Sequence, residues 1–397
     1  MLTDALIAAV GERVSHHTRE LLEIRRDLHA HPELSRAETR TTAVIADRLA
    51  LAGVSARLLP GTGLLCEVGA PDPDYRVALR ADMDALPVRE RTGLPFASQV
   101  SGVCHACGHD VHTVALLGAI IALKECEDQL IEAGLAVRGI FQPAEEVIPG
   151  GAEEAIHAGA MEGVDMAFAV HCDPTLDVGQ IGVREGPLTA ACDSITVSLH
   201  GRGGHTSRPQ LTEDLTYALA KIITDVPAAL SRRLDPRAGA ALVWGSVHAG
   251  KASNVIPSTG ECAGTLRMLD AHAWLTVGPL LEEIVQGVAA PYAVTAKLER
   301  IKGVPPVVNT ADAIAVMRLA AGPSGLISVP TQQSLGGEDF SWYLAHSPGA
   351  MVRLGTRTHG GQTYDLHQGD LVVDEEAVTL GARVLANAAI LSIPAVG

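Results

Sequence analysis

The sequence predicts an α/β protein: a layered domain with a mostly parallel central sheet, and an inserted α+β domain of ferredoxin-like order. Over about the first 185 residues, short apolar runs alternate with stretches of helical periodicity, as in proteins built from strands and helices in layers. Beyond that point the expected order becomes β-α-β-β-α-β. We therefore expect residues 1–185 and 301–397 to form one discontinuous domain around an insertion of residues 186–300.

The layered domain begins with two predicted helices. Apolar positions at helical spacing predict the first over residues 4–30. Ser35 and Glu38 form a capping-box pattern that opens the second, which ends near Gly53. Apolar runs then predict strands over 76–81, 135–141 and 164–170, a buried helix over 114–123, and further helix and strand over 311–322, 350–355 and 374–392.

The insertion is predicted from the same kinds of pattern. Its expected strands are 193–201, 240–250, 261–269 and 292–300, and its expected helices are 211–230 and 271–290. The two helices are separated by two strands, which distinguishes this region from the β–α alternation before it.

Composition excludes several classes of protein. A net charge of −16, from 30 basic and 46 acidic residues, disfavours nucleic acid as a partner. No apolar run reaches the ~18 residues needed to cross a membrane, and Asp4, Glu12 and Arg13 interrupt any signal-peptide pattern. Seven cysteines, an odd number in a long chain, argue against a disulfide framework and favour a cytoplasmic enzyme with reduced thiols.

The densest candidate site lies between Cys104 and His112. Six of these nine residues carry side chains that bind metals, and thiolate together with imidazole suits zinc or another late transition metal. Gly108 allows an unusual backbone angle between Cys107 and His109. A redox pair formed by Cys104 and Cys107, or ordinary burial of these residues at a helix start, remains an alternative.

Three predicted strands end in further candidates. Glu145 and Glu146 follow one strand, His171 ends another, and Asp82 and Asp84 end a third. Ligands bind at the carboxyl ends of strands in open α/β sheets, so these groups are expected to converge at one edge.

Other candidates have weaker support from spacing alone. One Glu of the Glu145-Glu146 pair can ligate a metal while its neighbour acts as general base, although such a pair taken alone is usually solvated. His367 ranks no better by spacing than other late histidines.

In the insertion, glycines 201, 203 and 204 indicate a tight turn that presents His205. The turn lacks the spacing of a phosphate-binding loop. Asn254 and Arg267 lie near the two middle strands, and Arg267 has the geometry to grip a carboxylate or to pair on the surface.

Together these motifs resemble the dinuclear metallo-aminoacylases and carboxypeptidases. The nearest subgroup is that of N-acyl-amino-acid amidohydrolases, hippurate hydrolase and the hydrolases of auxin–amino-acid conjugates. The matching stretches are LHAHPELS (28–35), LRADMDALPV (79–88), HACGHDVHT (105–113), QPAEE (142–146), AVHCDP (169–174), GRGGHTSRP (201–209), NVIP (254–257), GTLR (264–267), GGEDFS (336–341) and LHQGDLVVDEEAV (366–378).

The resemblance implies roles that spacing could not assign. Two divalent ions, zinc, manganese, cobalt or nickel, would be bound by five ligands: Cys107, His109, Glu146, His171 and His367. Glu145 would be the general base and acid, and Asp84 would orient a ligand from behind. The insertion would be a lid that dimerises, so that His205 reaches the active site of a second copy and stabilises the oxyanion. Asn254 and Arg267 would contact the substrate, with Arg267 near its carboxylate.

The resemblance also implies the reaction. The expected enzyme is a metallohydrolase of linear amides that converts an N-acyl-amino acid and water into a carboxylate and an amino acid, acting on a small molecule as a homodimer. The alternatives are a metallo-carboxypeptidase or dipeptidase and, from a different class, a non-enzymatic metal-binding protein. Asp82 stands where the carboxypeptidases carry a ligand His, which favours the Cys-containing subgroup. Cys104 and Thr206 also depart from the usual residues and leave the shape of the substrate pocket open.

Overall fold

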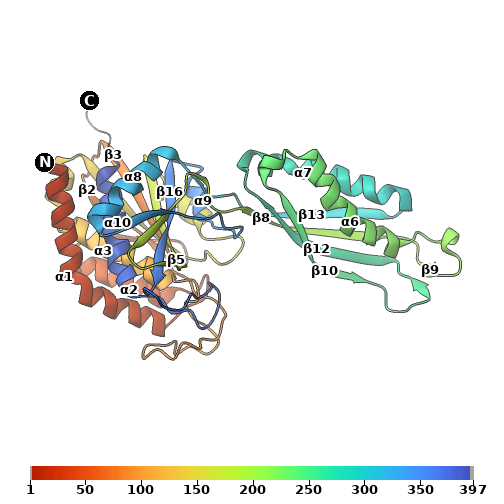
Figure 1. The fold of residues 1–397 in the computed structure, drawn as a ribbon, viewed down its shortest axis with the longest axis horizontal. Coiled ribbons are helices and arrows are strands. Elements are labelled where there is room, and N and C mark those ends of the chain that lie inside the picture. The colour runs from red at the N-terminus through yellow and green to blue at the C-terminus, as the bar shows by residue number, and fades with distance from the viewer. Residues whose placement is uncertain (1, 394–397) are drawn as a thin grey trace. The chain divides into compact units, whose positions relative to one another are not determined.

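The computed structural model describes residues 2–393, and only the backbone of Leu2 (Figure 1). Met1 and residues 394–397, which the predicted domain boundaries include, lie outside the described residues. The chain forms two compact units. The first contains the chain up to Leu188, Val308–Gln332 and the chain from Asp339 on, and the second contains Thr189–Val307 and Gln333–Glu338.

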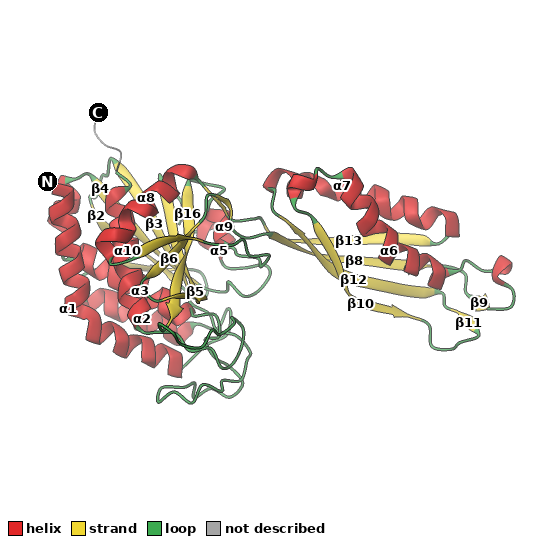
Figure 2. Cartoon of the chain, viewed as in Figure 1, coloured by secondary structure: helices red, strands yellow, loops and turns green. Residues whose placement is uncertain are grey.

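The first unit is built on an eight-stranded sheet in the order β1-β2-β4-β3-β5-β16-β6-β15 (Figure 2). Its strands are β1 (Ala56–Leu58), β2 (Leu64–Gly69), β3 (Tyr75–Asp82), β4 (Leu135–Gln142), β5 (Met166–Asp177), β6 (Gln180–Val183), β15 (Ile327–Pro330) and β16 (Gly349–Arg357). A separate two-stranded ribbon joins β7 (Gly186–Pro187) to β14 (Val308–Asn309).

The sheet is mixed: four of its seven strand pairs are parallel, and the prediction of a mostly parallel sheet missed the three antiparallel pairs. The central pairs β4–β3, β3–β5 and β5–β16 are parallel, as is β6–β15. The pairs β1–β2, β2–β4 and β16–β6 are antiparallel. The strands β1, β2 and β6 are only three to six residues long, and their patterns were too short to predict, so the antiparallel pairs were missed.

The helices of the first unit are α1 (Leu2–Ala30), α2 (Thr39–Leu51), α3 (His109–Lys124), α4 (Glu127–Glu132), α5 (Ala152–His157), α8 (Ala311–Ala321), α9 (Phe340–Tyr343) and α10 (Glu376–Leu391). The helices α1, α3 and α10 pack against one another, and α3 also packs on the strands β3 and β5. Nearly every residue of α3 is buried, so the first turn of this helix is a rigid place from which to present side chains.

The predicted capping box does not form. Helix α2 begins at Thr39, and Glu38 at its N-cap makes no side-chain cap hydrogen bond. Instead, Glu38 accepts hydrogen bonds from the Thr62 hydroxyl at 2.7 Å and the Ala144 peptide N–H at 2.8 Å. The Ser35 hydroxyl donates to Asp84 at 2.6 Å. Both residues of the expected cap are therefore used to hold loops at the sheet edge.

The second unit has a four-stranded antiparallel sheet in the order β10-β12-β8-β13 (Figure 2). Its long elements follow the order β8 (Ala191–His200), α6 (Leu215–Arg233), β10 (Ala241–Ala249), β12 (Thr259–Met268), α7 (Ala271–Ala289) and β13 (Thr295–Val304). The short strands β9 (Gly204–His205) and β11 (Val255–Ile256) pair with each other. Within residues 2–393, no helix combines the length and the apolar character needed to span a membrane.

Candidate metal centre

The site is assembled where β3, β4 and β5 lie side by side and α3 begins. Because these three strands are parallel, their carboxyl ends share one edge of the sheet. Asp82 and Asp84 follow this edge from β3, and Glu145 and Glu146 follow it from β4. His171 lies within β5, which continues to Asp177, rather than at the strand end as expected.

Gly108 sets the positions of Cys107 and His109. Its φ of 83° lies in the left-handed region, and it is the N-cap of α3. A Cβ atom at this position would lie 2.7 Å from the Cys172 sulfur. Only glycine therefore allows the chain to turn here, directly between the two side chains that face the site.

The structure brings together all five residues that the resemblance assigns as ligands. The Cys107 sulfur lies 3.5 Å from His171 Nε2. Glu146 Oε1 lies 3.7 Å from His109 Nε2 and 3.4 Å from His367 Nε2. The candidate ligand sets Cys107/His109/His171, Cys107/Glu146/His367 and His109/Glu145/Glu146 each have their ligand atoms within 4.8 Å of one another.

The histidine rings are turned so that Nε2 faces the cluster. In His171, Nδ1 donates to the Cys172 carbonyl at 2.8 Å, which leaves a lone pair on Nε2 beside Cys107. In His109, Nδ1 lies 3.3 Å from an oxygen of Asp84 and Nε2 points to Glu146. Such an outer partner is the usual way in which a protein orients a metal-binding imidazole.

Asp84 organises the neighbouring acidic pair. One carboxylate oxygen accepts from the Glu145 peptide N–H at 3.1 Å, and the other accepts from the Glu146 N–H at 3.0 Å. Burial alone would raise the pKa of Asp84, but its hydrogen bonds with His109 and Ser35 hold the pKa below the ordinary value. Asp84 therefore stays ionised and positions both glutamates.

The loop that carries the glutamates contains a strained residue. Ala144 has a φ of 55°, a conformation that costs a non-glycine residue about 1–3 kcal/mol. The buried Glu38 side chain accepts the Ala144 N–H and so holds the turn in place. Such strain at a site is maintained only when the surroundings fix it, as they do here.

His112 and Asp82 are close to the cluster but are fully used in hydrogen bonds. His112 Nδ1 donates to Asp82 at 2.6 Å, and its Nε2 accepts the Cys172 N–H at 2.7 Å. Neither ring nitrogen has a lone pair left for a metal. Sequence reasoning counted His112 among six possible metal-binding residues but gave it no specific role, although its position three residues after His109 on one helix indicated proximity.

The donor set fits a divalent cation. His109 Nε2 and Glu146 Oε1 are sealed from solvent and, among the described residues, have no hydrogen-bond partner. Buried polar atoms in this state are costly unless something bonds to them. Although burial opposes it, the negative charge of Asp82 and the hydrogen bond with Asp84 raise the pKa of His109 well above its ordinary value. The cluster thus attracts positive charge, which a proton or a metal ion can supply.

The structure gives no support to a redox pair. Burial raises the pKa of the Cys104 thiol to about 11 and that of Cys107 to about 12. Reactive redox cysteines have lowered pKa values, because the thiolate is the reacting species.

The other three predicted residues lie in the second unit. His205 is exposed on β9, where its Nδ1 accepts the Ser207 N–H at 3.1 Å. The pairing of His205 with Val255 brings it beside Asn254. Arg267 lies on β12 and donates to the Leu335 carbonyl.

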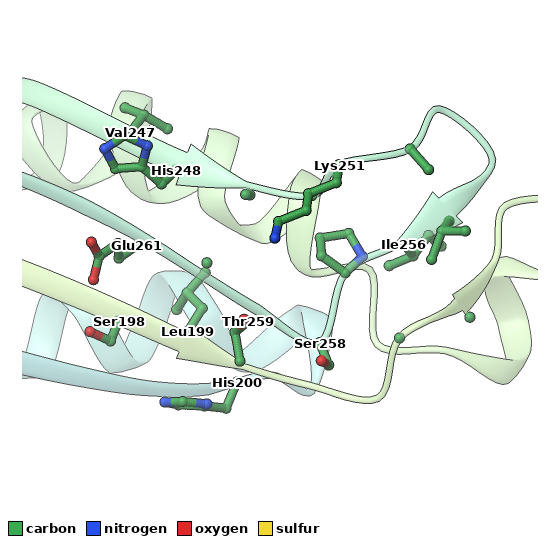
Figure 3. Close-up of a pocket in the computed structure, with 18 residues that line it drawn as sticks. Ser198, Leu199, His200, Val247, His248, Lys251, Ile256, Ser258, Thr259 and Glu261 are labelled. Carbon is green, nitrogen blue, oxygen red and sulfur yellow. The ribbon is translucent and has the colours of Figure 1, made fainter.

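A pocket of about 1040 Å³ opens on the same unit, beside the β9–β11 ribbon (Figure 3). Its labelled residues include His200, His248 and Lys251. Its 18 lining residues include Gly204 and Val255 of the ribbon but not His205, Asn254 or Arg267.

Residues 78–390 match the model of Peptidase family M20/M25/M40. The chain belongs to this family. M20 membership places it among hydrolases that act on amide bonds. The N-acetylcysteine deacetylase of Bacillus subtilis is 37% identical over 94% of this chain and 97% of its own length.

Two further proteins are similar to this chain over most of its length. A dinuclear metal-binding peptidase of the family from Bacillus subtilis has a solved structure with a TM-score of 0.82 and 35% identity, covering 95% of this chain and 98% of that one. A protein of Rhodococcus jostii named as a glutamate–cysteine ligase is 48% identical over 92% of this chain. The chain spans only 46% of that protein's length.

Proposed function

We propose that this M20 protein is a metal-dependent amidohydrolase that cleaves the amide bond of N-acyl-amino acids. The observation that carries the proposal is the adjacent pair Glu145 and Glu146. Glu146 faces His109 and His367 as a ligand would, while Glu145 is held beside it by the hydrogen bond to Asp84. A purely structural metal site has no need of a second carboxylate in this position. Relatives named as an N-acetylcysteine deacetylase and an N-acyl-L-amino acid amidohydrolase support the choice of N-acyl-amino acids. A relative named as a carboxypeptidase keeps peptides as the alternative.

The proposed ligands of two divalent ions are Cys107, His109, Glu146, His171 and His367. The ions are zinc, manganese, cobalt or nickel, because mixed sulfur, nitrogen and oxygen ligation selects weakly among them. When bound, they would polarise the amide carbonyl and lower the pKa of a water toward ~7.

The chain's own residues would then move the protons. Glu145 accepts a proton from the attacking water and later delivers it to the leaving amine nitrogen, which must be protonated to depart. Asp84 fixes the backbone of this base through the peptide N–H. The buried hydrogen bonds of Asp84, Glu38 and Ser35 keep the base in register with the ligand cluster.

The second unit is proposed to act as a ferredoxin-like lid that also dimerises. The order of its long elements supports this proposal. In this proposal His205 stabilises the oxyanion in the partner subunit, and Asn254 and Arg267 contact the substrate. We also propose a cytoplasmic location, since all seven cysteines are free thiols.

Substitution of the base tests the assignment. Glu145→Gln is expected to bind metal with unchanged stoichiometry, while kcat falls about 10²- to 10⁴-fold because proton transfer is lost. Metal content and kcat are measured on the same preparation. Glu153→Gln on α5, an exposed carboxylate, is the matched control and retains activity. Wild-type turnover in Glu145→Gln would overturn the assignment.

A panel of candidate substrates, assayed with metal-reconstituted protein, tests the substrate class. It contains hippurate, N-acetyl-amino acids including N-acetylcysteine, long-chain acyl conjugates, indole-acetyl conjugates and dipeptides. The proposal predicts faster cleavage of acyl-amino acids. Faster cleavage of dipeptides would instead identify a dipeptidase or carboxypeptidase.

A further inference from the structure

Arg353 is a buried arginine beside the metal centre. It lies on β16, where its backbone is in register with His171 on β5 and with Gly182 on β6. Its exposed fraction is only 8%. Partners in parallel register direct their side chains to the same face of a sheet, so the Arg353 and His171 side chains share a face.

Arg353 differs from the other buried arginines of the first unit. Arg25 bonds to Asp110 at 2.7 Å, and Arg80 bonds to Asp82 at 2.6 Å and to Asp339 at 2.7 Å. Among the described residues, the Arg353 guanidinium has no hydrogen bond or ion pair. A buried charge is normally paired, because removal from water costs several kcal/mol.

No described carboxylate is a partner of Arg353. By register, the next acidic residue on this face of β5 is Asp173, whose Oδ1 accepts from the Thr175 N–H and hydroxyl. On the other side, Gly182 has no side chain to cover the arginine. The guanidinium nitrogens are not among the described polar atoms that are both sealed from solvent and unpaired, so they keep some contact with solvent.

Through this register, Arg353 neighbours a residue of the candidate metal centre. The backbone of His171 is the parallel partner of Arg353. The His171 imidazole in turn lies 3.5 Å from the Cys107 sulfur.

We propose that Arg353 binds a carboxylate of the substrate from within the metal-binding unit. This inference rests on the proposed function and names its substrate class. Arg267 is already proposed to contact the carboxylate that every N-acyl-amino acid carries, so the preferred substrates carry a second one. That carboxylate belongs either to the amino-acid side chain or to the far end of the acyl group. In both cases the planar guanidinium forms two parallel hydrogen bonds to it.

The test compares two dicarboxylates with neutral counterparts on metal-loaded enzyme. N-acetyl-L-glutamate is paired with N-acetyl-L-glutamine, and N-succinyl-L-leucine is paired with N-acetyl-L-leucine. We expect kcat/KM to favour one of the dicarboxylates at least about tenfold, as one charged hydrogen-bonded pair supplies. The preferred dicarboxylate shows whether Arg353 binds the amino-acid side chain or the far end of the acyl group.

Three variants test whether Arg353 causes the preference for a dicarboxylate. Arg353→Gln is expected to lower kcat/KM for the preferred dicarboxylate about 10- to 100-fold and to abolish the preference. Arg353→Lys retains the charge without the bidentate geometry and gives an intermediate preference. Arg357→Gln, on the same strand but paired with Asp177, is the matched control and keeps the wild-type ratio.

A binding measurement does not depend on turnover. Calorimetric titration of metal-free protein with glutarate is expected to show binding to the wild type and none to Arg353→Gln, with circular dichroism confirming that both are folded. Three results overturn the inference: no preference for either dicarboxylate, a preference that persists in Arg353→Gln, or an equal loss on mono- and dicarboxylates. If no amide is cleaved at all, the proposed function fails, and the glutarate titration alone decides the role of Arg353.

Discussion

Histidine has two distinct uses within a few ångströms in this protein. His109 and His171 each turn Nε2 toward a cluster of ligand atoms. His112, whose ring centre lies 5.0 Å from that of His171, uses both nitrogens in hydrogen bonds. The outer partner of each ring decides which use it has, because that partner fixes the position of the proton.

His112 is therefore expected to position His171 without binding metal. His112→Ala leaves the Asp82 carboxylate and the Cys172 N–H buried without their partner. The expected loss of unfolding free energy is about 3 kcal/mol or more, from two unsatisfied groups. Urea unfolding of the metal-free protein measures it.

Metal affinity, measured at a temperature where His112→Ala is folded, shows whether His112 positions a ligand or only stabilises the fold. We expect weaker binding with unchanged stoichiometry. His346→Ala, at an exposed histidine, is the control and should change stability by no more than about 0.5 kcal/mol. Loss of one metal ion from His112→Ala would show that His112 is a ligand after all.

At the scale of elements, long periodic segments were predicted from sequence and short ones were not. The helices α1, α6 and α7 and the central strands lie close to their expected ranges. Strands of three or four residues, such as β1, β6 and β15, carry too little pattern to be recognised. Ser35 and Glu38 matched a local capping motif, but tertiary hydrogen bonds to the site replaced it.

The candidate site shows the same division. Parallel strands bring their ends to one edge, so Glu145, Glu146 and His171 were predictable as a group. His367 was not, because it lies in a loop distant in sequence and is placed by a φ of 62° and the hydrogen bond from its N–H to the Ala106 carbonyl. Only the family resemblance indicated it.

The turn at the start of α3 gives a prediction for an element. Gly108→Ala is expected to cost more than the ~1 kcal/mol of a left-handed backbone alone, because the new Cβ would collide with Cys172. It should also weaken metal binding by displacing Cys107 and His109. Thermal unfolding and metal titration measure the two effects.

Gly93→Ala provides the matched control. Gly93 has a similar positive φ of 71°, but a Cβ there would meet nothing within 4 Å. Gly93→Ala should lose stability, because alanine disfavours the left-handed backbone, and should keep full metal affinity. An equal loss of stability and an unchanged metal affinity in both variants would show that the contact with Cys172 does not control the position of the ligands.

At the scale of the whole molecule, the net charge of −16 opposes the approach of an anionic substrate. Attraction must therefore be local. The proposed metal ions and Arg353, which has no partner among the described residues, are two groups of the first unit that would supply it.

The proposed dimer leads to a prediction about complementation between subunits. Glu145→Ala removes the base of its own site, and His205→Ala removes the oxyanion donor that is proposed to serve the partner. Mixing the two inactive variants should restore partial activity, because one site of each mixed dimer receives both residues. Activity is measured after subunit exchange has been verified by mass spectrometry. Verified exchange without recovery would exclude a role for His205 across subunits.

The discontinuity of the first unit also sets an order of events during synthesis. Cys107, His109, Glu146 and His171 leave the ribosome before the second unit, whereas His367 follows it. At ~5–20 residues per second, roughly 10 to 40 seconds separate His171 from His367. Throughout that interval the nascent chain would hold only four of the five proposed ligands. If the proposed ligand set is right, full metal loading would become possible only when translation is nearly complete, after the second unit has emerged.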